Sequence, residues 1–373
     1  MANILEINAI NALVLVNESI QEQNYTTMAN FFDDLFTLIK NKITDDAKYP
    51  DTVESSYVGV HINEKYEESD FLKMIEAFRG NQMIHAKYAL QILNDAIRNY
   101  EKQPNIPQLN LNQHKSRADT IIVGDLHGSF KDLYYIINKF GVPGKNYRFI
   151  FNGDFVDRGS QQCEVLLTLL FAYLLHPKSV FLNRGNHEDL SINVNSNFSP
   201  NFRTDTKNKF NQYSLAVFKQ TQRLFRRLPI ATILENKSGY RCFVCHGGIS
   251  DRLDLDFCKT KLNRFSFPSI ILDETKSSEQ LSDLMWSDPI KRIDEALPAN
   301  GCYPNKSRGI GCAFGEDISE KFCKKYGFNT IVRSHELRRN GWSKDHPYCY
   351  TVFTASNYCN GNNNLYFRLS FYS

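Results

Sequence analysis

The sequence predicts an α/β fold that is preceded by a helical N-terminal extension. Two observations carry this prediction. From residue 120 on, short apolar runs alternate with polar, glycine-containing loops and helix-like stretches, an order that is typical of α/β proteins. Before residue 110, apolar residues instead recur at spacings of three and four, as they do on one face of a helix. The 373 residues are enough for one large domain or two smaller ones.

Helix-like spacing marks residues 28–43 and 68–100 of the N-terminal part. The polar segment between them, residues 44–59, is rich in turn-forming residues. The prolines of QPNIP, residues 103–107, break the second stretch. We expect residues 1–84 to form a helical extension of undefined role, to which a regulatory or targeting protein could bind.

Polar loops follow the strand-like runs of the remaining chain. In sheets of this type, ligands bind in the loops beyond the carboxyl ends of the strands. We therefore expect the functional residues in these loops. The strand-like runs are TIIV (120–123), RFIF (148–151), SVFLN (179–183), YRCFVC (240–245), TIVR (330–333) and YTVFTASNYC (350–359), and helix-like stretches lie at 131–140 and 163–175.

The overall composition excludes several classes of protein. The net charge is +3, which is too small to indicate a surface for nucleic acid or for a membrane. No stretch of the sequence is long and apolar enough to span a bilayer. The N-terminus lacks the basic flank and the long apolar run of a signal peptide. We therefore expect neither a nucleic-acid partner nor a membrane span.

The chain has nine cysteines, an odd number that does not indicate a disulfide framework in a chain of this length. We expect a reducing compartment, the cytoplasm or the nucleus. Cys242 and Cys245 have the CxxC spacing, but the sequence has no second CxxC that would complete a zinc site. Because both lie in a strand-like run, we expect two packed thiols.

Side chains of the kind that bind metal ions follow five of the strand-like runs. Aspartate, asparagine and histidine supply oxygen and nitrogen ligands that suit Mn, Fe or Zn better than Ca. Their number is too high for one tetrahedral ion and suits two ions, about 3.5–4 Å apart, that share a carboxylate and hold a phosphoryl group. We expect Asp154 to be the shared carboxylate, Asp157 an acid outside the metal ligands and Arg158 a phosphate ligand. The residues of this pattern are Asp125, His127, Asp154, Asn186, His187, His246 and His335.

Five motifs, in the same order along the chain, resemble the signature of the PPP family of metal-dependent serine/threonine protein phosphatases. Three other stretches, LMWSDP (284–289), RGIGCAFG (308–315) and NYC (357–359), resemble further blocks of that family. The likeness is greatest to the type 5 and EF-hand phosphatases, although no EF-hand loop and no TPR repeat is recognisable in the sequence. The five motifs are GDLHG (124–128), GDFVDRG (153–159), RGNHE (184–188), HGG (246–248) and RSHE (333–336).

This resemblance implies a calcineurin-like metallophosphoesterase sandwich of two mixed β-sheets flanked by helices. Residues 85–373 would form this catalytic domain. The resemblance also implies two divalent metal ions, either Mn or an Fe/Zn pair. The implied ligands are Asp125, His127 and Asp154 for the first ion, and Asp154, Asn186, His246 and His335 for the second.

The resemblance further implies how a phosphate ester is hydrolysed. A hydroxide that bridges the two ions would attack phosphorus, and His187, oriented by Asp157, would protonate the leaving alkoxide. Arginine suits the binding of phosphate, because its planar guanidinium contacts two oxygens at once. The implied catalytic residues are His187, Asp157, Arg158 and Arg308, and the implied substrate-binding residues are Arg158, Asn186, Arg308 and Tyr358.

Two features depart from the family pattern. Between His187 and Tyr213 the family usually has a recognisable arginine and a Tyr-Gly-Phe, and this sequence has a different pattern there. The unusual loop, residues 189–205, could reshape one substrate groove. Ser356 stands where many members have proline before Asn-Tyr-Cys, which could alter the loop over the site.

We expect a protein phosphatase that acts on phosphoserine and phosphothreonine in phosphoprotein substrates. One alternative keeps the two metal ions and changes the substrate to phosphotyrosine or a nucleotide. A third hypothesis is a catalytically inactive module that binds phosphoproteins. The complete set of metal-type ligands and both arginines argue against the inactive module.

Overall fold

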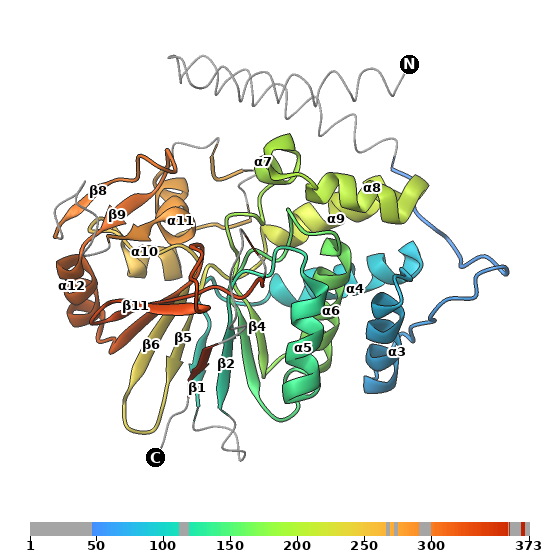
Figure 1. The fold of residues 1–373 in the computed structure, drawn as a ribbon, viewed down its shortest axis with the longest axis horizontal. Helices are drawn as coiled ribbons and strands as arrows, with labels where there is room; N and C mark the ends of the chain where they lie inside the picture. The colour runs from blue at the N-terminus through green and yellow to red at the C-terminus, as the bar shows by residue number, and fades with distance from the viewer. Residues whose placement is uncertain are drawn as a thin grey trace.

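The computed structural model describes residues 47–111, 119–265, 269–271, 275–290, 300–356, 358 and 367–369. Two mixed β-sheets pack face to face, and helices cover the outer face of each (Figure 1). This confirms the sandwich expected from the sequence. The helix-like stretch at 28–43 lies outside the described residues. Within the described ranges, every helix is too short or too polar to span a bilayer.

The smaller sheet contains the first three predicted strands. Its order is β13-β2-β3-β4, in which β2, β3 and β4 are parallel and β13 is antiparallel to β2. All residues of β2, β3 and β4 are buried, because one face of the sheet meets the larger sheet and the other meets helices. Strands that are covered on both faces read as continuous apolar runs, as these do. The strands are β2 (Thr120–Val123), β3 (Arg148–Phe151), β4 (Val180–Leu182) and β13 (Phe367–Leu369).

The larger sheet has the order β1-β5-β6-β10-β12-β11 and mixes parallel and antiparallel pairs. The run predicted as a strand at 350–359 is shorter than expected, since β12 ends at Val352. Phe353 then forms an isolated bridge with Asp125, and the chain turns toward β2. The strands are β1 (Gln108–Asn110), β5 (Ala231–Glu235), β6 (Arg241–Cys245), β10 (Thr330–Arg333), β11 (Trp342–His346) and β12 (Cys349–Val352). A third, three-stranded sheet consists of β7 (Asp288–Pro289), β8 (Cys302–Pro304) and β9 (Cys312–Phe314), in the order β7-β9-β8.

The two large sheets share a small apolar core. Ile122 and Ile150 of the smaller sheet belong to one buried cluster with Val244 of the larger. Cys242 lies in this same cluster, whereas Cys245 belongs to the cluster on the opposite face of β6. Both thiols are fully buried, which confirms the expectation of packed thiols.

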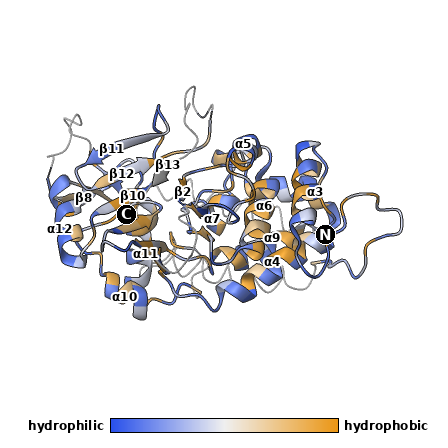
Figure 2. Cartoon of the chain, turned by 90° about the horizontal axis from the view of Figure 1, so that it is seen from below, coloured by the Kyte–Doolittle hydropathy of each residue, from blue (hydrophilic) through white to orange (hydrophobic). Residues whose placement is uncertain are grey.

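Helix α6 is apolar around its whole circumference because it is the central helix of its layer. Its residues from Gln162 to Tyr173 are all buried. Figure 2 shows hydrophobic residues concentrated where α4, α6 and α9 lie together. The helices on this side are α3 (Glu68–Arg79), α4 (Ala86–Tyr100), α5 (Phe130–Phe140), α6 (Gln162–Leu175), α7 (Leu190–Asn193), α8 (Phe202–Phe210) and α9 (Ser214–Phe225), with the 3₁₀ turns η1 (Ser196–Phe198) and η2 (Asn211–Tyr213). The helices α10 (Leu255–Thr260), α11 (Lys276–Trp286) and α12 (Glu316–Tyr326) cover the larger sheet (Figure 1).

The stretch predicted as helical from 68 to 100 is two helices, α3 and α4. Helix α3 ends at Arg79, and Asn81 adopts a left-handed backbone conformation with φ of 57°. Glycine and asparagine adopt the left-handed conformation at helix ends more readily than other residues. The pair Gly80-Asn81 was therefore the local signal for the break between the helices.

Helix α3 precedes residue 85 but packs on helices that follow it. The rings of Phe71 and Phe171 lie 5.7 Å apart in an edge arrangement, and those of Phe78 and Phe130 lie 5.8 Å apart. Met74 belongs to the same buried cluster. The apolar core therefore runs across the expected boundary at residues 84 and 85, and that division stays a prediction.

Candidate active site

Apart from Arg308 and Tyr358, the candidate residues lie in loops at the carboxyl ends of β2, β3, β4, β6 and β10. Five of them that are not glycine adopt a left-handed backbone, which costs such residues about 1–3 kcal/mol each. This conformation persists only where the surrounding structure imposes it, and it is concentrated at functional sites. The five residues are His127 (φ 42°), Asp154 (φ 55°), Asp157 (φ 64°), Arg158 (φ 73°) and His335 (φ 69°).

The β4 loop approaches the β3 loop closely at Gly185. A Cβ atom at this position would collide with the backbone nitrogen and the carboxylate of Asp154. Glycine is therefore required there, and it lets Asn186 and His187 lie directly beside Asp154. The His187 backbone N–H donates to Asp154 Oδ1 at 2.9 Å.

One group of possible metal ligands surrounds His127. Its Nε2 lies 3.6 Å from Asp154 Oδ2 and 3.8 Å from Asp125 Oδ2. Its Nδ1 lies 3.0 Å from the Val156 carbonyl oxygen, so Nδ1 carries the proton and Nε2 presents a lone pair. Asp125 Oδ2 is buried and has no hydrogen-bond partner among the described residues.

A second group lies on the other side of Asp154. His246 Nε2 is 3.3 Å from Asp154 Oδ1, while its Nδ1 lies 2.7 Å from the Asn152 carbonyl oxygen. The Asn186 side-chain oxygen lies 3.2 Å from each carboxylate oxygen of Asp154 and 2.9 Å from His335 Nδ1. The Asn186 oxygen thus faces other acceptor atoms. Either the amide is rotated so that its NH₂ group points at them, or a cation lies among them.

These residues fit two metal ions. Two groups of buried side chains, His127, Asp154 and His187 on one side and Asp154, His246 and His335 on the other, each have ligand atoms within 4.8 Å of one another. Asp154 belongs to both groups, as a shared carboxylate requires. The unpartnered oxygen of Asp125 adds an oxygen ligand on the first side.

The charges of this cluster also favour a cation. Burial and the nearby charge of Asp154 raise the pKa of Asp125 to about 6. Burial opposes a protonated His246, but Asp154 outweighs it and raises the pKa of His246 to about 9. A proton on His246 thus partly neutralises the carboxylates, and a divalent cation would do so more completely.

His187 differs from the other histidines of the site because a carboxylate holds its Nδ1. The distance from Nδ1 to Asp157 Oδ2 is 2.8 Å. Burial lowers the pKa of His187, yet the charges of Asp154 and Asp157 outweigh it and raise the pKa above the ordinary histidine value. The arrangement favours an imidazolium whose Nε2 faces the site, as a general acid requires.

Two further residues support these loops, and neither was assigned a role from the sequence. Asn193 Nδ2 donates to Asp157 Oδ2 at 2.9 Å and to the His187 carbonyl oxygen at 2.7 Å. The fully buried Glu188 accepts hydrogen bonds from the backbone N–H groups of Asp154 and Gly185 at 2.7 and 2.8 Å. Glu188 lies within the RGNHE motif, which was a usable signal; Asn193 lies in segment 189–205, where the family pattern gave none.

Arg158 lies between two aromatic rings beside His187. Its guanidinium carbon is 5.2 Å from the centre of the Phe198 ring and 5.3 Å from that of Tyr358. Its Nη2 lies 3.4 Å from His187 Nε2. The Tyr358 ring stacks on His127 with 5.3 Å between ring centres. Segment 189–205 therefore contributes an aromatic ring, Phe198, beside the candidate proton donor.

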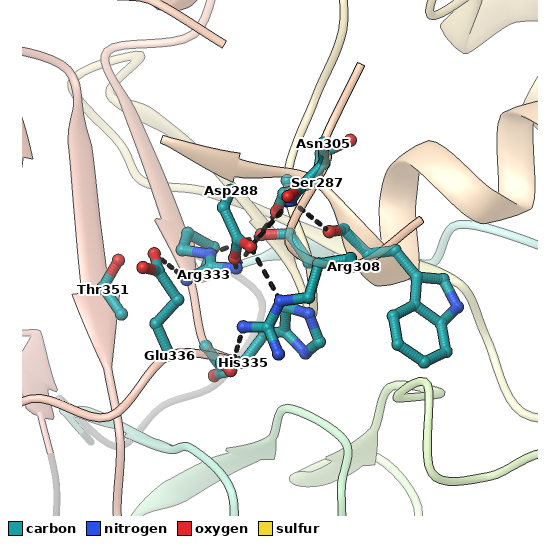
Figure 3. A network of polar contacts seen from close by, with 12 residues as sticks. Ser287, Asp288, Asn305, Arg308, Arg333, His335, Glu336 and Thr351 are labelled. Carbon is teal, nitrogen blue, oxygen red and sulfur yellow. Dashed lines mark hydrogen bonds and ion pairs between the residues drawn. The ribbon is translucent and has the colours of Figure 1, made fainter. Parts of the chain in front are cut away.

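Arg308 approaches the site from the three-stranded sheet. Its Nε donates to Asp288 Oδ2 at 3.0 Å, and its Nη2 lies 3.4 Å from the His335 carbonyl oxygen. Asp288 also accepts from Arg333 Nη2 at 2.9 Å and from Asn305 Nδ2 at 2.9 Å (Figure 3). Asp288 was not assigned a role from the sequence. It holds Arg308 through Nε, so that Nη2 of Arg308 lies near the His335 loop.

Comparisons with known proteins agree with this geometry. A family model described as calcineurin-like phosphoesterase matches residues 119–339. The chain is 34% identical over 348 residues to the serine/threonine-protein phosphatase with EF-hands 1 of Rattus norvegicus, covering 86% of this chain and 51% of that protein. It is 35% identical over 317 residues to the serine/threonine-protein phosphatase T of Schizosaccharomyces pombe, covering 84% and 61%.

A solved structure of a protein serine/threonine phosphatase from Saccharomyces cerevisiae, described as similar to human phosphatase PP5, superposes with a TM-score of 0.66. It is 32% identical, and the match covers 79% of this chain and 85% of that one. The chain therefore belongs to the calcineurin-like phosphoesterase family. It spans about half to three-fifths of the length of the two curated relatives.

A second family model, described as PPP5 TPR repeat region, matches residues 20–108. This match corrects the expectation that the chain has no TPR repeats. A 34-residue self-similarity, the usual sign of such repeats, is not evident in the sequence. The described end of the matched range contains the helix pair α3 and α4.

Proposed function

We propose that this chain is a metal-dependent protein phosphatase that hydrolyses phosphoserine and phosphothreonine monoesters. The observation that carries the proposal is the buried cluster centred on Asp154, with the His187–Asp157 pair and Arg158 at its edge. The named activities of the relatives support it. A cluster without a proton donor or a phosphate-binding guanidinium would fit a metal store as well as an enzyme.

Asp125, His127 and Asp154 would hold one divalent ion, and Asp154, Asn186, His246 and His335 the other. The donor set of imidazoles, carboxylates and one amide suits Mn or an Fe/Zn pair. When bound, such ions lower the pKa of water and offset negative charge on a phosphoryl group.

The protein's own groups would bind the ester and supply a proton. Arg158 and Arg308 would bind phosphate oxygens, with Tyr358 bordering the bound group. His187 would donate its Nε2 proton to the leaving oxygen, while Asp157 keeps the ring charged and oriented. Asn193 would hold Asp157 and the backbone of His187 at a fixed distance from each other.

A second candidate function is the same hydrolysis on phosphotyrosine. Phe198 and Tyr358 flank Arg158 and would offer aromatic contacts to a phenyl ring. The comparison of kcat/KM on one peptide that carries each of the three phosphoresidues separates the candidates. A tenfold preference for phosphotyrosine, about 1.4 kcal/mol in transition-state binding, would favour the second.

Metal analysis and an activity assay test the metal-dependent chemistry directly. We expect about two transition ions per chain, loss of p-nitrophenyl phosphate hydrolysis on chelation and recovery with Mn. Full activity in excess chelator would overturn the proposal. Bound metal without turnover of any phosphoester would indicate the inactive binding module.

We also infer that the N-terminal extension binds a regulatory or targeting protein. Its match to a TPR repeat region supports a binding role. We also propose that the protein acts in a reducing compartment, the cytoplasm or the nucleus. In support, all cysteines in the described part of the chain are free thiols.

A further inference from the structure

Asp132, on α5, forms an unusual connection to the segment that leads to Tyr358. It is only 2% exposed, and none of the ion pairs in the described part of the chain involves it. Its Oδ2 accepts the backbone N–H of Ser356 at 2.7 Å, and its Oδ1 accepts the Ser356 hydroxyl at 2.6 Å. The Ser129 hydroxyl also donates to Oδ2, at 2.6 Å. A buried carboxylate that lacks a cation is stabilised by such hydrogen bonds, so these three donors are energetically important.

Ser356 is not acting as an ordinary turn residue. Serine in turns usually hydrogen-bonds to backbone groups a few positions away. Here both donors of Ser356 reach one carboxylate that is 224 positions away in the sequence. The contact therefore fixes one segment of the chain to another and does not merely shape a local turn.

The two residues before Ser356 hydrogen-bond to the loop that leads into α5, the helix of Asp132. The Thr354 hydroxyl accepts the backbone N–H of Gly124 at 2.9 Å. The Ala355 backbone N–H donates to the Asp125 carbonyl oxygen at 2.7 Å. Three successive residues thus bind the loop that carries Asp125 and the helix that follows it, and Ser356 is the last of the three before Tyr358.

Tyr358 contacts both kinds of candidate site residue. Its ring stacks on His127 at an interplanar angle of 14° and lies 5.3 Å from the guanidinium carbon of Arg158. It also contacts Phe353, with 5.2 Å between ring centres. A shift of this ring would alter the surface against which a phosphorylated side chain lies and the position of the guanidinium.

We propose that Ser356, held by Asp132, is a positioning residue that fixes Tyr358 over His127 and beside Arg158, and thereby sets the affinity for the phosphorylated side chain. This inference rests on the proposed function, since it assigns a substrate-binding role to the same site. Ser356 acts through Tyr358 and does not itself touch the reacting atoms.

The test compares Ser356→Ala, which removes only the hydroxyl bond, with Ser356→Thr, which keeps it. Ser356→Ala should raise the KM for a phosphoserine peptide and the inhibition constant of inorganic phosphate about 3–10-fold, the effect of losing one hydrogen bond. The kcat should change less than about twofold, and Ser356→Thr should resemble the wild type. Ser356→Pro, which lacks both donors, should have the largest effect.

Ser129→Ala is the matched control, because it removes a hydroxyl bond to the same carboxylate without touching the segment that leads to Tyr358. It should leave the KM unchanged. In a Tyr358→Ala background, Ser356→Ala should have little further effect, since residues that act through one contact are not additive.

Unchanged KM and phosphate inhibition in Ser356→Ala would overturn the inference, as would full additivity with Tyr358→Ala or an equal loss in Ser129→Ala. Should the wild type fail to hydrolyse the peptide, the proposed function fails separately. Calorimetric binding of inorganic phosphate to the Mn-loaded protein then gives the same comparison, with a weaker affinity expected in Ser356→Ala.

Discussion

At the scale of single residues, the partner of Nδ1 prepares each histidine for a different task. Backbone carbonyl oxygens accept from Nδ1 of His127 and His246, so that Nε2 of each ring faces Asp154 and would bind a cation, which at His246 would replace a proton. The Asp157 carboxylate accepts from His187 instead, which favours a charged ring. Three histidines in one cluster therefore divide into two kinds, although the sequence alone presents them alike.

The first prediction distinguishes a proton donor from a ligand at His187, which also lies within ligand distance of His127 and Asp154. His187→Asn should keep two metal ions and lower kcat about 10²–10⁴-fold, the usual contribution of a positioned acid. Asp154→Asn should lose metal, because both ligand groups depend on it. Metal analysis and phosphopeptide kinetics measure the two effects. A loss of metal from His187→Asn would show that this ring is a ligand.

The second prediction concerns pH. A general acid works only while protonated, so kcat falls as the pH rises through its pKa. Asp154 and Asp157 raise the pKa of His187 despite its burial, and this keeps the acid protonated to higher pH. Asp157→Asn should therefore move the alkaline limb of the kcat profile to lower pH. Asp205→Asn removes another buried carboxylate, which accepts the backbone N–H of Cys163, and should leave the limb in place. An unmoved limb in Asp157→Asn would exclude His187 as the titrating acid.

At the scale of elements, features that depend on the local sequence pattern were predicted, whereas features that depend on contacts between distant segments were not. Strands β2 and β3 coincide with their predicted residues, because both faces of each are covered and the apolar run is continuous. The sheet order and the entry of Phe198 into the site were not predictable, since they depend on packing between distant segments. The roles of Asn193 and Asp288 were missed for the same reason; Asn193 lies 36 positions from its partner Asp157.

The third prediction concerns the attachment of α4. Arg264 is 2% exposed and donates to the carbonyl oxygens of Tyr100, Gln103 and Arg227 at 3.0, 2.8 and 3.0 Å. A guanidinium at the end of a helix satisfies carbonyl groups that the helix leaves free. Arg264→Ala should lower the free energy of unfolding by about 3 kcal/mol, because several buried acceptors lose their donor.

Thermal and urea unfolding measure this change. Arg79→Ala is the control: this arginine is mostly exposed, pairs with Glu76 on its own helix and donates one hydrogen bond to the Tyr134 hydroxyl of α5 at 2.9 Å, so its loss should cost only about 1 kcal/mol. Equal effects of the two substitutions would contradict the assignment.

At the scale of the whole molecule, one apolar core joins the N-terminal helices to the smaller sheet. The cluster extends from Ile62 and Phe71 to Val123 of β2 and Leu228 after α9. Segments before α3 take part as well, since Tyr66 donates to Asp95 at 2.6 Å and its ring lies 5.1 Å from that of Phe171. Helices α3 and α4 therefore share one apolar core with the smaller sheet.

The fourth prediction follows from this shared core and uses three shortened chains. A chain of residues 47–373 keeps the whole described cluster and should match the full chain in stability and phosphatase activity. A chain of residues 66–373 loses Ile62 and the hydrogen bond of 2.6 Å between His61 Nδ1 and Tyr88, so it should fold with a lower Tm and keep its kcat.

A chain of residues 119–373 lacks α3 and α4 and would expose α6, whose residues 162–173 are all buried. Exposed apolar surface of that extent favours association, so this chain should aggregate. Size-exclusion chromatography, calorimetry and phosphopeptide kinetics on the three chains give the answer, and a soluble, fully active 119–373 chain would show that the catalytic unit begins after α4.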